Sequence, residues 1–306
     1  RGGYGAGTTS TLKFYTDNIN TMTHKAGKVG IGTDDPTQKL EVAGTALVEN
    51  AKLKAIAESK SDTARDVFVY DTSKDSDGGA WRHRTQHTSW YNETLNTSTR
   101  GATKKFPSVA VIVAEPYKMI IYDGDNPDLP MWMVFNGQNA GGYLGYGIGA
   151  GRALSSVVAL NGSIHTGGLV GNWATTINFI TELGTGVGVG STVTSHTQIV
   201  NRNTASDLTT VSTTKSLVNG IINDVAVTVL PNAPIDADTR LPVSTLAAAT
   251  DGGVSVIKDD GSVVDITSTS HSSANQINFT KENQLSFYNA PHYSLAIQDI
   301  PTSDET

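Results

Sequence analysis

Short runs of β-branched and other apolar residues, each followed by a turn sequence, recur from residue 66 to the end of the chain. The clearest runs are 67–70, 109–114 with 119–122 and then 131–135, 155–162 with 163–167, 246–252 with 254–257, and 276–279 with 284–288. Runs of this length that are bounded by Gly, Asn and Asp are typical of β-hairpins. Gly is abundant, at 31 residues, and charged residues make up only 17%, which also favours β-structure. The chain is therefore predicted to be all-β, without long helices.

The hairpins repeat at a spacing typical of propeller blades. Val111 and Val158 lie roughly 45 residues apart, and the turn glycines Gly162 and Gly252 lie roughly twice that interval apart. Residues 61–306 are therefore predicted to form a β-propeller-like domain of four-stranded repeats, with about five blades. The ring of blades is expected to be incomplete or to be closed by sequence outside this chain. One blade is expected to contain 177–180, 197–200 and 224–230. β-Sheets stacked along a trimeric fibre remain the alternative, because the period alone does not separate the two.

The densest local pattern lies near the start of the chain, between residues 28 and 44. Apolar residues lie two apart on either side of a turn at 33–36, at Val29, Ile31, Leu40 and Val42. This alternation predicts a hairpin with one buried face. Gly30 and Gly32 take the outward positions, where glycine destabilises an ordinary strand by about 0.5–1 kcal/mol. We infer that another backbone approaches them closely, and we expect it to be a second copy of the same chain.

The same residues resemble a known repeat. The pattern V-G-I-G-T-x-x-P-x-x-K-L-x-V-x-G, from Val29 to Gly44, is similar to one found in bacteriophage tail fibres, tailspikes and their chaperone-bearing relatives. In that family the segment belongs to the shaft or collar of a homotrimer. The resemblance therefore implies assembly contacts at Val29, Gly30, Ile31, Gly32, Pro36, Leu40 and Val42. An ordinary hairpin in a monomeric β domain is the alternative.

A domain boundary is expected at 58–62, where small and charged residues replace apolar ones. Residues 1–60 are then predicted to form a trimeric β shaft or collar segment, and 61–306 the propeller-like domain. Two stretches of the second part, 66–92 and 243–265, are similar to modules of large tail-fibre proteins of environmental phages. These likenesses imply a virion appendage but assign no ligand.

Composition argues against several classes of protein. The formal net charge is −7 and no run of basic residues is present, which argues against a nucleic-acid-binding surface. The longest apolar runs, such as 109–114, are too short to span a bilayer, so membrane insertion is not expected. The absence of cysteine excludes disulfides, thiol catalysis and thiolate metal sites. The chain opens at Arg1 without Met and ends at Thr306, so we expect it to be a segment of a longer polypeptide.

Two acidic stretches invite a search for chemistry. Residues 73–78 follow the first half of an EF-hand loop, but Arg84 stands where the bidentate Glu should be, so no metal is predicted. The second stretch brings together Asp123, Asp125 and Asp128 as candidate binding residues, which can share a hard cation or supply a carboxyl with a raised pKa for acid catalysis. A solvated turn is the alternative, because Asp, Gly, Asn and Pro are all turn formers. We predict no catalytic residue and no cofactor.

Aromatic side chains supply the other candidate binding residues. Sugars stack on exposed aromatic faces, so Trp81, Trp90 and Tyr91, which are expected on loops, are candidates for binding a glycan. The alternative is that they are core residues. For Trp132, within Met-Trp-Met-Val-Phe, the core is favoured.

The sequence thus predicts a virion structural protein, extracellular, on a phage tail appendage, which builds a homotrimer and scaffolds or contributes to recognition of the host surface. The expected partners are two further copies of the chain, other tail or baseplate proteins, and a host cell-surface glycan. Two alternatives stay open. One is a polysaccharide-degrading propeller enzyme that uses Asp123, Asp125 or Asp128 as acid and base. The other is a head-fibre or capsid decoration protein.

Overall fold

A computed structural model gives the structure of the 306-residue chain. It describes the backbone of 11–16, 19–25, 28–31 and 40–42, and then residues 61–137, 153–169, 173–195, 198–204, 208–213, 215–267, 273–289 and 294–305. The chain divides into two compact units, Arg1–Lys52 and Leu53–Thr306. The predicted domain limits at residues 60 and 61 stay a prediction. In the part of the chain that the structure describes, no helix is long and apolar enough to cross a membrane.

The first unit contains a four-stranded sheet, in the order β1 (Thr11–Thr16), β2 (Ile19–Lys25), β3 (Lys28–Ile31) and β4 (Leu40–Val42). The predicted hairpin between the last two strands is wrong, because β3 and β4 pair in parallel, with Val29 opposite Leu40. A tight turn enforces antiparallel pairing, whereas a parallel partner requires the chain to return along the first strand. Gly32 and Pro36 lie outside the described residues, as do the side chains of the other predicted assembly positions.

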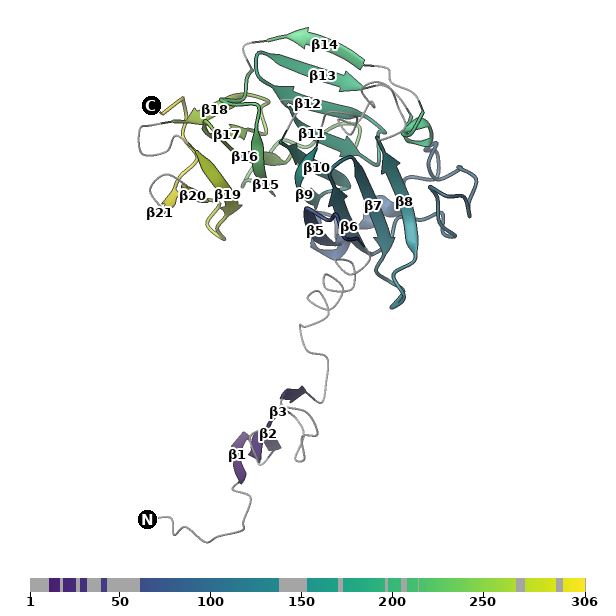
Figure 1. The fold of residues 1–306 in the computed structure, drawn as a ribbon, viewed down its shortest axis with the longest axis vertical. Helices are drawn as coiled ribbons and strands as arrows, with labels where there is room; N and C mark the ends of the chain where they lie inside the picture. Colours follow the sequence, from purple (N-terminus) through teal and green to yellow (C-terminus); the bar gives the residue numbers. More distant parts are fainter. Residues whose placement is uncertain are drawn as a thin grey trace. The chain divides into compact units, whose positions relative to one another are not determined.

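The second unit is all-β, as predicted, and is built from four antiparallel sheets in which strands that are consecutive in sequence lie side by side (Figure 1). The first sheet contains β5 (Asp66–Asp71), β6 (Val109–Glu115), β7 (Lys118–Asp123) and β8 (Met131–Asn136). The second contains β9 (Leu154–Leu160), β10 (Ser163–Gly168), β11 (Trp173–Asn178), β12 (Gly184–Gly188), β13 (Ser191–Ser195) and β14 (Leu208–Ser212). The third contains β15 (Ile222–Thr228), β16 (Thr245–Thr250), β17 (Gly253–Ile257) and β18 (Val263–Ile266). The fourth contains β19 (Ala274–Phe279), β20 (Leu285–Asn289) and β21 (Ser294–Gln298). Short 3-10 turns at η1 (Thr72–Lys74), η2 (Ala80–His83) and η3 (Ile199–Asn201) are the helical elements of the described residues.

The predicted hairpins are confirmed, but the predicted repeat is not in register with the sheets. The pairs β6–β7, β9–β10, β16–β17 and β19–β20 join the runs expected from the sequence. Val111, however, lies in the second strand of its sheet and Val158 in the first. Gly162 likewise follows a first strand, whereas Gly252 follows a second. The stretch expected to make one blade is divided among β11, η3 and β15, and the described residues hold four sheets of three to six strands.

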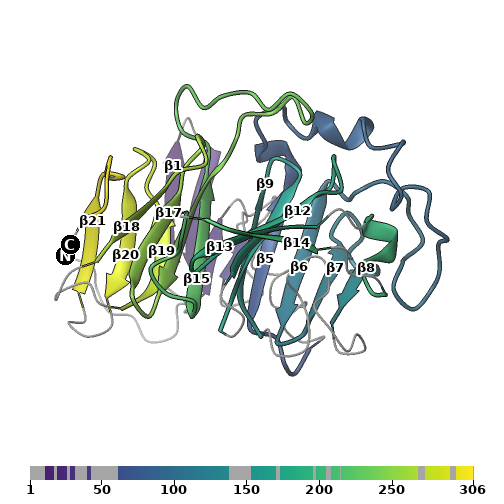
Figure 2. The same ribbon diagram turned by 90° about the horizontal axis from the view of Figure 1, so that it is seen from above.

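The four sheets are joined through their first strands (Figure 2). β5 packs beside β9, β9 beside β15, and β15 beside β19. At each junction an amide of the following strand donates to a side chain of the preceding one: Val157 N to Asp66 Oδ2 at 2.8 Å, Val225 N to Ser156 Oγ at 3.4 Å, and Ile277 N to Asp224 Oδ2 at 2.9 Å. We refer to these three contacts as the inner-strand bridges. They satisfy amides that have no ladder partner on that side, and so fix the order and spacing of the sheets.

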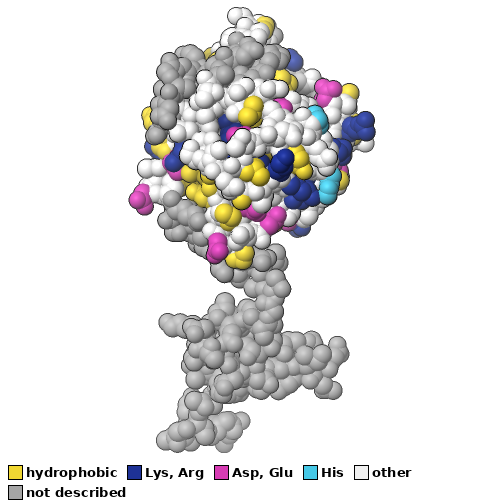
Figure 3. Space-filling model, turned by 90° about the vertical axis from the view of Figure 1, so that its right-hand side faces the viewer, with side chains coloured by type: hydrophobic (Ala, Val, Ile, Leu, Met, Phe, Trp, Pro, Cys, Tyr) yellow, Lys and Arg dark blue, Asp and Glu magenta, His cyan; other side chains and the backbone are white. Residues whose placement is uncertain are grey.

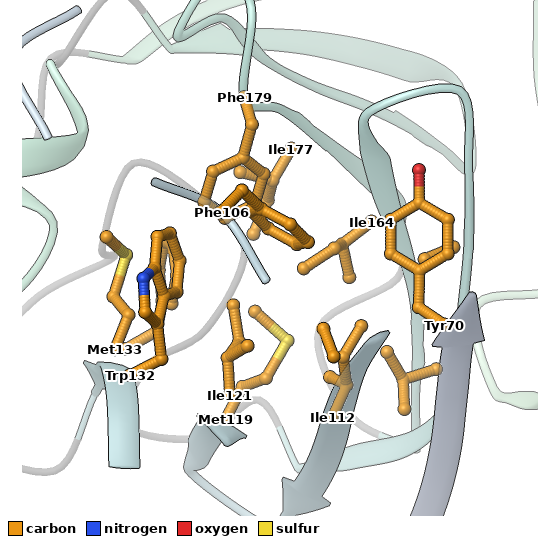
Figure 4. Close-up of a cluster of buried hydrophobic side chains, with 14 of the residues drawn as sticks. Tyr70, Phe106, Ile112, Met119, Ile121, Trp132, Met133, Ile164, Ile177 and Phe179 are labelled. Atoms are coloured by element: carbon orange, nitrogen blue, oxygen red, sulfur yellow. The ribbon is translucent and has the colours of Figure 1, made fainter. Parts of the chain in front are cut away.

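The largest core lies between the first and second sheets and is rich in aromatic side chains (Figure 4). Phe106, from the long connection between β5 and β6, lies at its centre, with its ring centroid 4.9 Å from that of Trp132 and 5.0 Å from that of Phe179. Such tilted and edge-on pairs contribute about 0.5–1.5 kcal/mol each beyond the burial of their area. The connection is thereby held firmly against both sheets.

Candidate functional site

A cleft of about 500 Å³ opens over strands β10, β11 and β12 of the second sheet. Residues 236–246, up to the start of β16, and residues 257–261, from the end of β17, form its walls. The two walls adjoin each other, because Leu246 of β16 pairs with Ile257 of β17. The floor is kept low by Gly186 in β12, where an added Cβ would lie 2.8 Å from Cγ2 of Val193. Of the alternating glycines of 184–190, Gly186 therefore serves close packing within the sheet, whereas Gly190 has a positive φ and open space around it.

His165 is the buried polar residue of the floor. It lies in β10 directly opposite Thr176 of β11, and its Nδ1 is 2.8 Å from Oγ1 of that threonine. Its Nε2 has no hydrogen-bond partner among the described residues, although the side chain is only 4% exposed. Burial lowers the pKa of His165 to about 4, so the imidazole is neutral near pH 7. A buried ring nitrogen without a partner costs about 1–3 kcal/mol, which a ligand hydroxyl can recover.

The remaining polar groups of the cleft come from its floor and walls. Asn178 Nδ2 donates to Ser163 Oγ at 3.1 Å, and Asn161 Nδ2 donates to the carbonyl of Pro242 at 3.2 Å. The second contact ties the wall to the floor, because Asn161 ends β9 and Pro242 belongs to the connection before β16. Thr185 adds a further hydroxyl. The cleft therefore offers several neutral hydrogen-bonding groups together with apolar surface, the mixture found in sites for small polar molecules.

The neutral state of His165 predicts a loss of stability in acid. Between pH 6.5 and pH 4 the unfolded chain binds a proton at this residue that the folded chain does not, so the free energy of unfolding should fall as the pH falls. The contribution is about 3 kcal/mol over that interval. Urea titrations at several pH values should show a shallower dependence in His165→Gln than in the wild type. His83→Gln, at an exposed position, is the control. Equal slopes for the wild type and His165→Gln would contradict the assignment.

The two predicted glycan-stacking tryptophans are core residues. Trp81 and Trp90 are both 0% exposed, so neither offers a face to a sugar, and the prediction for them is wrong. Their ring N–H groups donate inward, from Trp81 Nε1 to Asp75 Oδ2 at 2.7 Å and from Trp90 Nε1 to the carbonyl of Phe179 at 2.9 Å. Tyr91 is half-buried against Trp90, and Nζ of Lys104 lies 5.7 Å from its ring centroid.

The predicted acidic residues lie together at the turn between β7 and β8, away from the lining of the cleft. Asp125 accepts from the amides of Ser108 and Val109 at 2.8 and 2.9 Å and from the Ser108 hydroxyl. Burial alone would raise the pKa of Asp125, but these donors lower it below its usual value. Burial raises the pKa of Asp123, whose Oδ1 accepts from the Asp125 amide. Asp128 is exposed. The structure thus uses Asp125 to fasten the turn.

The segment that resembles half an EF-hand is also structural. Asp75 is buried and accepts from Tyr70 Oη at 2.6 Å, from Trp81 Nε1 and from the amide of Asn161 at 2.7 Å. Asp77 pairs with Arg84 at 3.1 Å. The described residues contain no group of three or more His, Asp or Glu side chains arranged to hold a metal ion. Asp75 therefore links the connection after β5 to the turn between β9 and the floor strand β10.

A basic cluster lies on the same long connection. Nζ of Lys105 is 3.2 Å from Nε2 of His83. Desolvation and, after it, the charge of Arg82 lower the pKa of Lys105, and the charge of Asp125 opposes that shift. Figure 3 shows Lys, Arg and His side chains gathered toward the right-hand side of the face that it draws. We refer to Arg82, His83, Lys104 and Lys105 as the basic cluster. None of these residues lines the cleft.

Sequence reasoning missed the cleft. His165 has no partner beside it in the sequence, because its partner Thr176 comes from the next strand. The walls carried no signal, because they belong to loops far along the chain.

No protein-family model and no curated protein matches the chain. Among solved structures, Hsv2 of Kluyvelomyces marxianus is 11% identical with a TM-score of 0.31, over 64% of this chain and 59% of that one. A chain of the Mitotic Checkpoint Complex is 9% identical with a TM-score of 0.33, over 62% and 59%. Virginiamycin B lyase from Staphylococcus aureus is 8% identical with a TM-score of 0.31, over 63% and 67%. This chain thus spans 59% of the length of the first two, and similarities of this size carry no inference about its activity.

Proposed function

We propose that this chain is a structural protein of a bacteriophage tail appendage, in which residues 1–60 build a homotrimeric shaft and 61–306 form a β-propeller-like domain that contributes to host recognition. The shaft rests on the resemblance of Val29–Gly44 to the fibre repeat. The propeller-like arrangement is supported by the four meander sheets, whose first strands follow one another through the inner-strand bridges. Other tail or baseplate proteins would hold the shaft on the virion, outside the cell.

The cleft is the observation that carries the recognition function. A neutral imidazole with a free ring nitrogen, a row of hydroxyl and amide groups, and apolar patches from Leu183, Val187 and Leu246 suit the hydroxyls and the ring of a saccharide. Three weak sites on one trimer would gain avidity on a repetitive cell surface. In this proposal the glycan binds in the cleft, and not at the tryptophans and acidic residues that the sequence suggested.

A glycan array tests this proposal. The full chain should bind at least one printed bacterial-type saccharide, and His165→Phe, which fills the floor and removes the ring nitrogen, should weaken that binding by at least about 10-fold. The same sample should sediment with three times the 32.2 kDa chain mass. Phe substitution at the exposed His87 is the control. Binding that survives His165→Phe, or the absence of binding, would contradict recognition through the cleft, and a monomeric mass would contradict the shaft.

A further inference from the structure

The charge around the cleft is one-sided. Its ionisable lining residues are Asp236, Asp238, Asp259 and Asp260, with Lys258 and His165. Burial keeps His165 neutral near pH 7. Lys258 and Lys215 both lie near Asp260 and, after its hydrogen bonds with Ser262, help to lower its pKa. Four carboxylates thus face the charges of Lys258 and of the nearby Lys215, so the surroundings of the cleft keep a net negative charge.

These carboxylates are divided between the two walls. Asp236 and Asp238 lie before β16, and Asp259 lies after β17. Asp236 Oδ1 accepts from the amides of Asp238 and Thr239 at 3.1 and 2.7 Å, which leaves its second oxygen available. No described residue donates a hydrogen bond to the side chain of Asp238 or Asp259. A ligand in the cleft therefore meets acceptors on two walls and the unpartnered Nε2 of His165 on the floor.

We propose that the cleft selects a saccharide bearing a free amino group over neutral and anionic saccharides of the same size. This inference rests on the proposed glycan-binding function of the same site. An ammonium group supplies three donors and a positive charge, which answer the free carboxylate oxygens, while sugar hydroxyls contact His165 and Thr185. An anionic sugar would bring a further negative charge to a site whose described lining carries four carboxylates and one lysine. The buried, unpartnered nitrogen of His165 is the independent sign that a ligand occupies the cleft.

The expected preference is moderate because the walls are open to solvent. Exposed ion pairs contribute little individually, and three of them together correspond to a preference on the order of 10-fold for the amino sugar over its neutral counterpart. The preference should shrink at high ionic strength, since the Debye length falls to about 3 Å at 1 M salt. Hydrogen bonds to the floor should be unaffected by salt.

Isothermal titration of the full chain with three matched trisaccharides tests the proposal. The probes are a glucosamine trimer, its N-acetylated form and a galacturonic acid trimer. We expect the amino form to bind about 10-fold more tightly than the acetylated form, and the acidic form to bind most weakly. The double variant Asp238→Asn and Asp259→Asn should abolish the preference for the amine while retaining the binding of the acetylated trimer. Asp62→Asn, at an exposed position away from the cleft, is the matched control.

The outcomes separate the two proposals. Equal affinity for the amino and acetylated trimers would overturn charge selection and leave the glycan site standing. No binding by any of the three would overturn charge selection, whereas the glycan site itself stands or falls by the array. Tighter binding of the acidic trimer than of the amino form at the cleft would overturn the inference. If the acidic trimer still bound the double variant but did not bind Lys105→Ala, its binding site would be the basic cluster and not the cleft, which would leave charge selection at the cleft supported.

Discussion

Replacing Arg202 by lysine should lower the free energy of unfolding by about 3–5 kcal/mol, although the positive charge is kept. The guanidinium of Arg202 is buried and donates to four acceptors. Nε donates to the carbonyl of Val134 at 2.7 Å, Nη2 to that of Thr99 at 2.8 Å, and Nη1 to Glu93 Oε2 at 2.9 Å and to the carbonyl of Ile199 at 3.0 Å. A lysine ammonium has three donors on a single atom and cannot reach acceptors spread around a planar fork. Buried carbonyls would then lose their partners.

The effect should be large because Arg202 belongs to a buried charge cluster. Glu93 lies between Arg202 and Arg100, whose Nε is 3.5 Å from the same carboxylate oxygen. Arg100 in turn lies over the ring of Trp132, 4.3 Å from its centroid, and donates to the carbonyl of that residue. These contacts join β8 to the connection before β6 and to η3. Displacing one guanidinium leaves Glu93 buried with a single, longer ion pair.

Urea denaturation of the wild type and Arg202→Lys measures the change. Arg65→Lys, at an exposed position, should change stability by less than about 0.5 kcal/mol and is the matched control. A decrease below about 1 kcal/mol in Arg202→Lys would mean that the fork geometry is not what holds these elements together.

The strands of the second unit were predictable because each hairpin has a local cause. Alternating apolar residues and turn residues such as Asn161–Gly162 depend on the few residues around them. The parallel pairing of β3 with β4 was not predictable in this way, because the apolar alternation of the two runs is the same for either direction of pairing. The tryptophans were misplaced for a related reason. Trp81 and Trp90 lie on a connection, but that connection packs between two sheets that come from distant parts of the sequence.

The repeat was misjudged because the wrong positions were compared. The structurally equivalent residues are the acceptors of the inner-strand bridges, Asp66, Ser156 and Asp224. They differ in residue type and are separated by unequal intervals. A trace of this survives in the sequence, as Asp66-Val-Phe-Val resembles Asp224-Val-Ala-Val. The cleft was invisible for a deeper reason, since its floor and its walls come from different sheets and meet only when the bridges align those sheets.

Asp224→Ala should weaken the attachment of the last sheet and lower the free energy of unfolding by about 3 kcal/mol. Asp224 Oδ2 accepts from the amide of Ile277 in β19, and Oδ1 accepts from the Ser156 hydroxyl at 2.7 Å and from the Val225 amide at 2.9 Å. Alanine would leave the Ile277 amide without its acceptor in a largely buried place, and would leave Val225 N and the Ser156 hydroxyl with only their longer contacts to Ser156 Oγ and Asp66 Oδ2. The Ile277 amide matters most, because it is the inner-strand bridge between the third and fourth sheets.

The location of the effect is a sharper test than its size. Hydrogen exchange of the β19 and β20 amides should accelerate more in Asp224→Ala than that of the β6 amides, because the first sheet keeps its own bridge through Asp66. Asp66→Ala should produce the opposite pattern, with faster exchange at Val157 in β9. Asp62→Ala should change neither. If both bridge variants accelerated exchange uniformly over all four sheets, the bridges would not be separate junctions, and the sheets would unfold as a single unit.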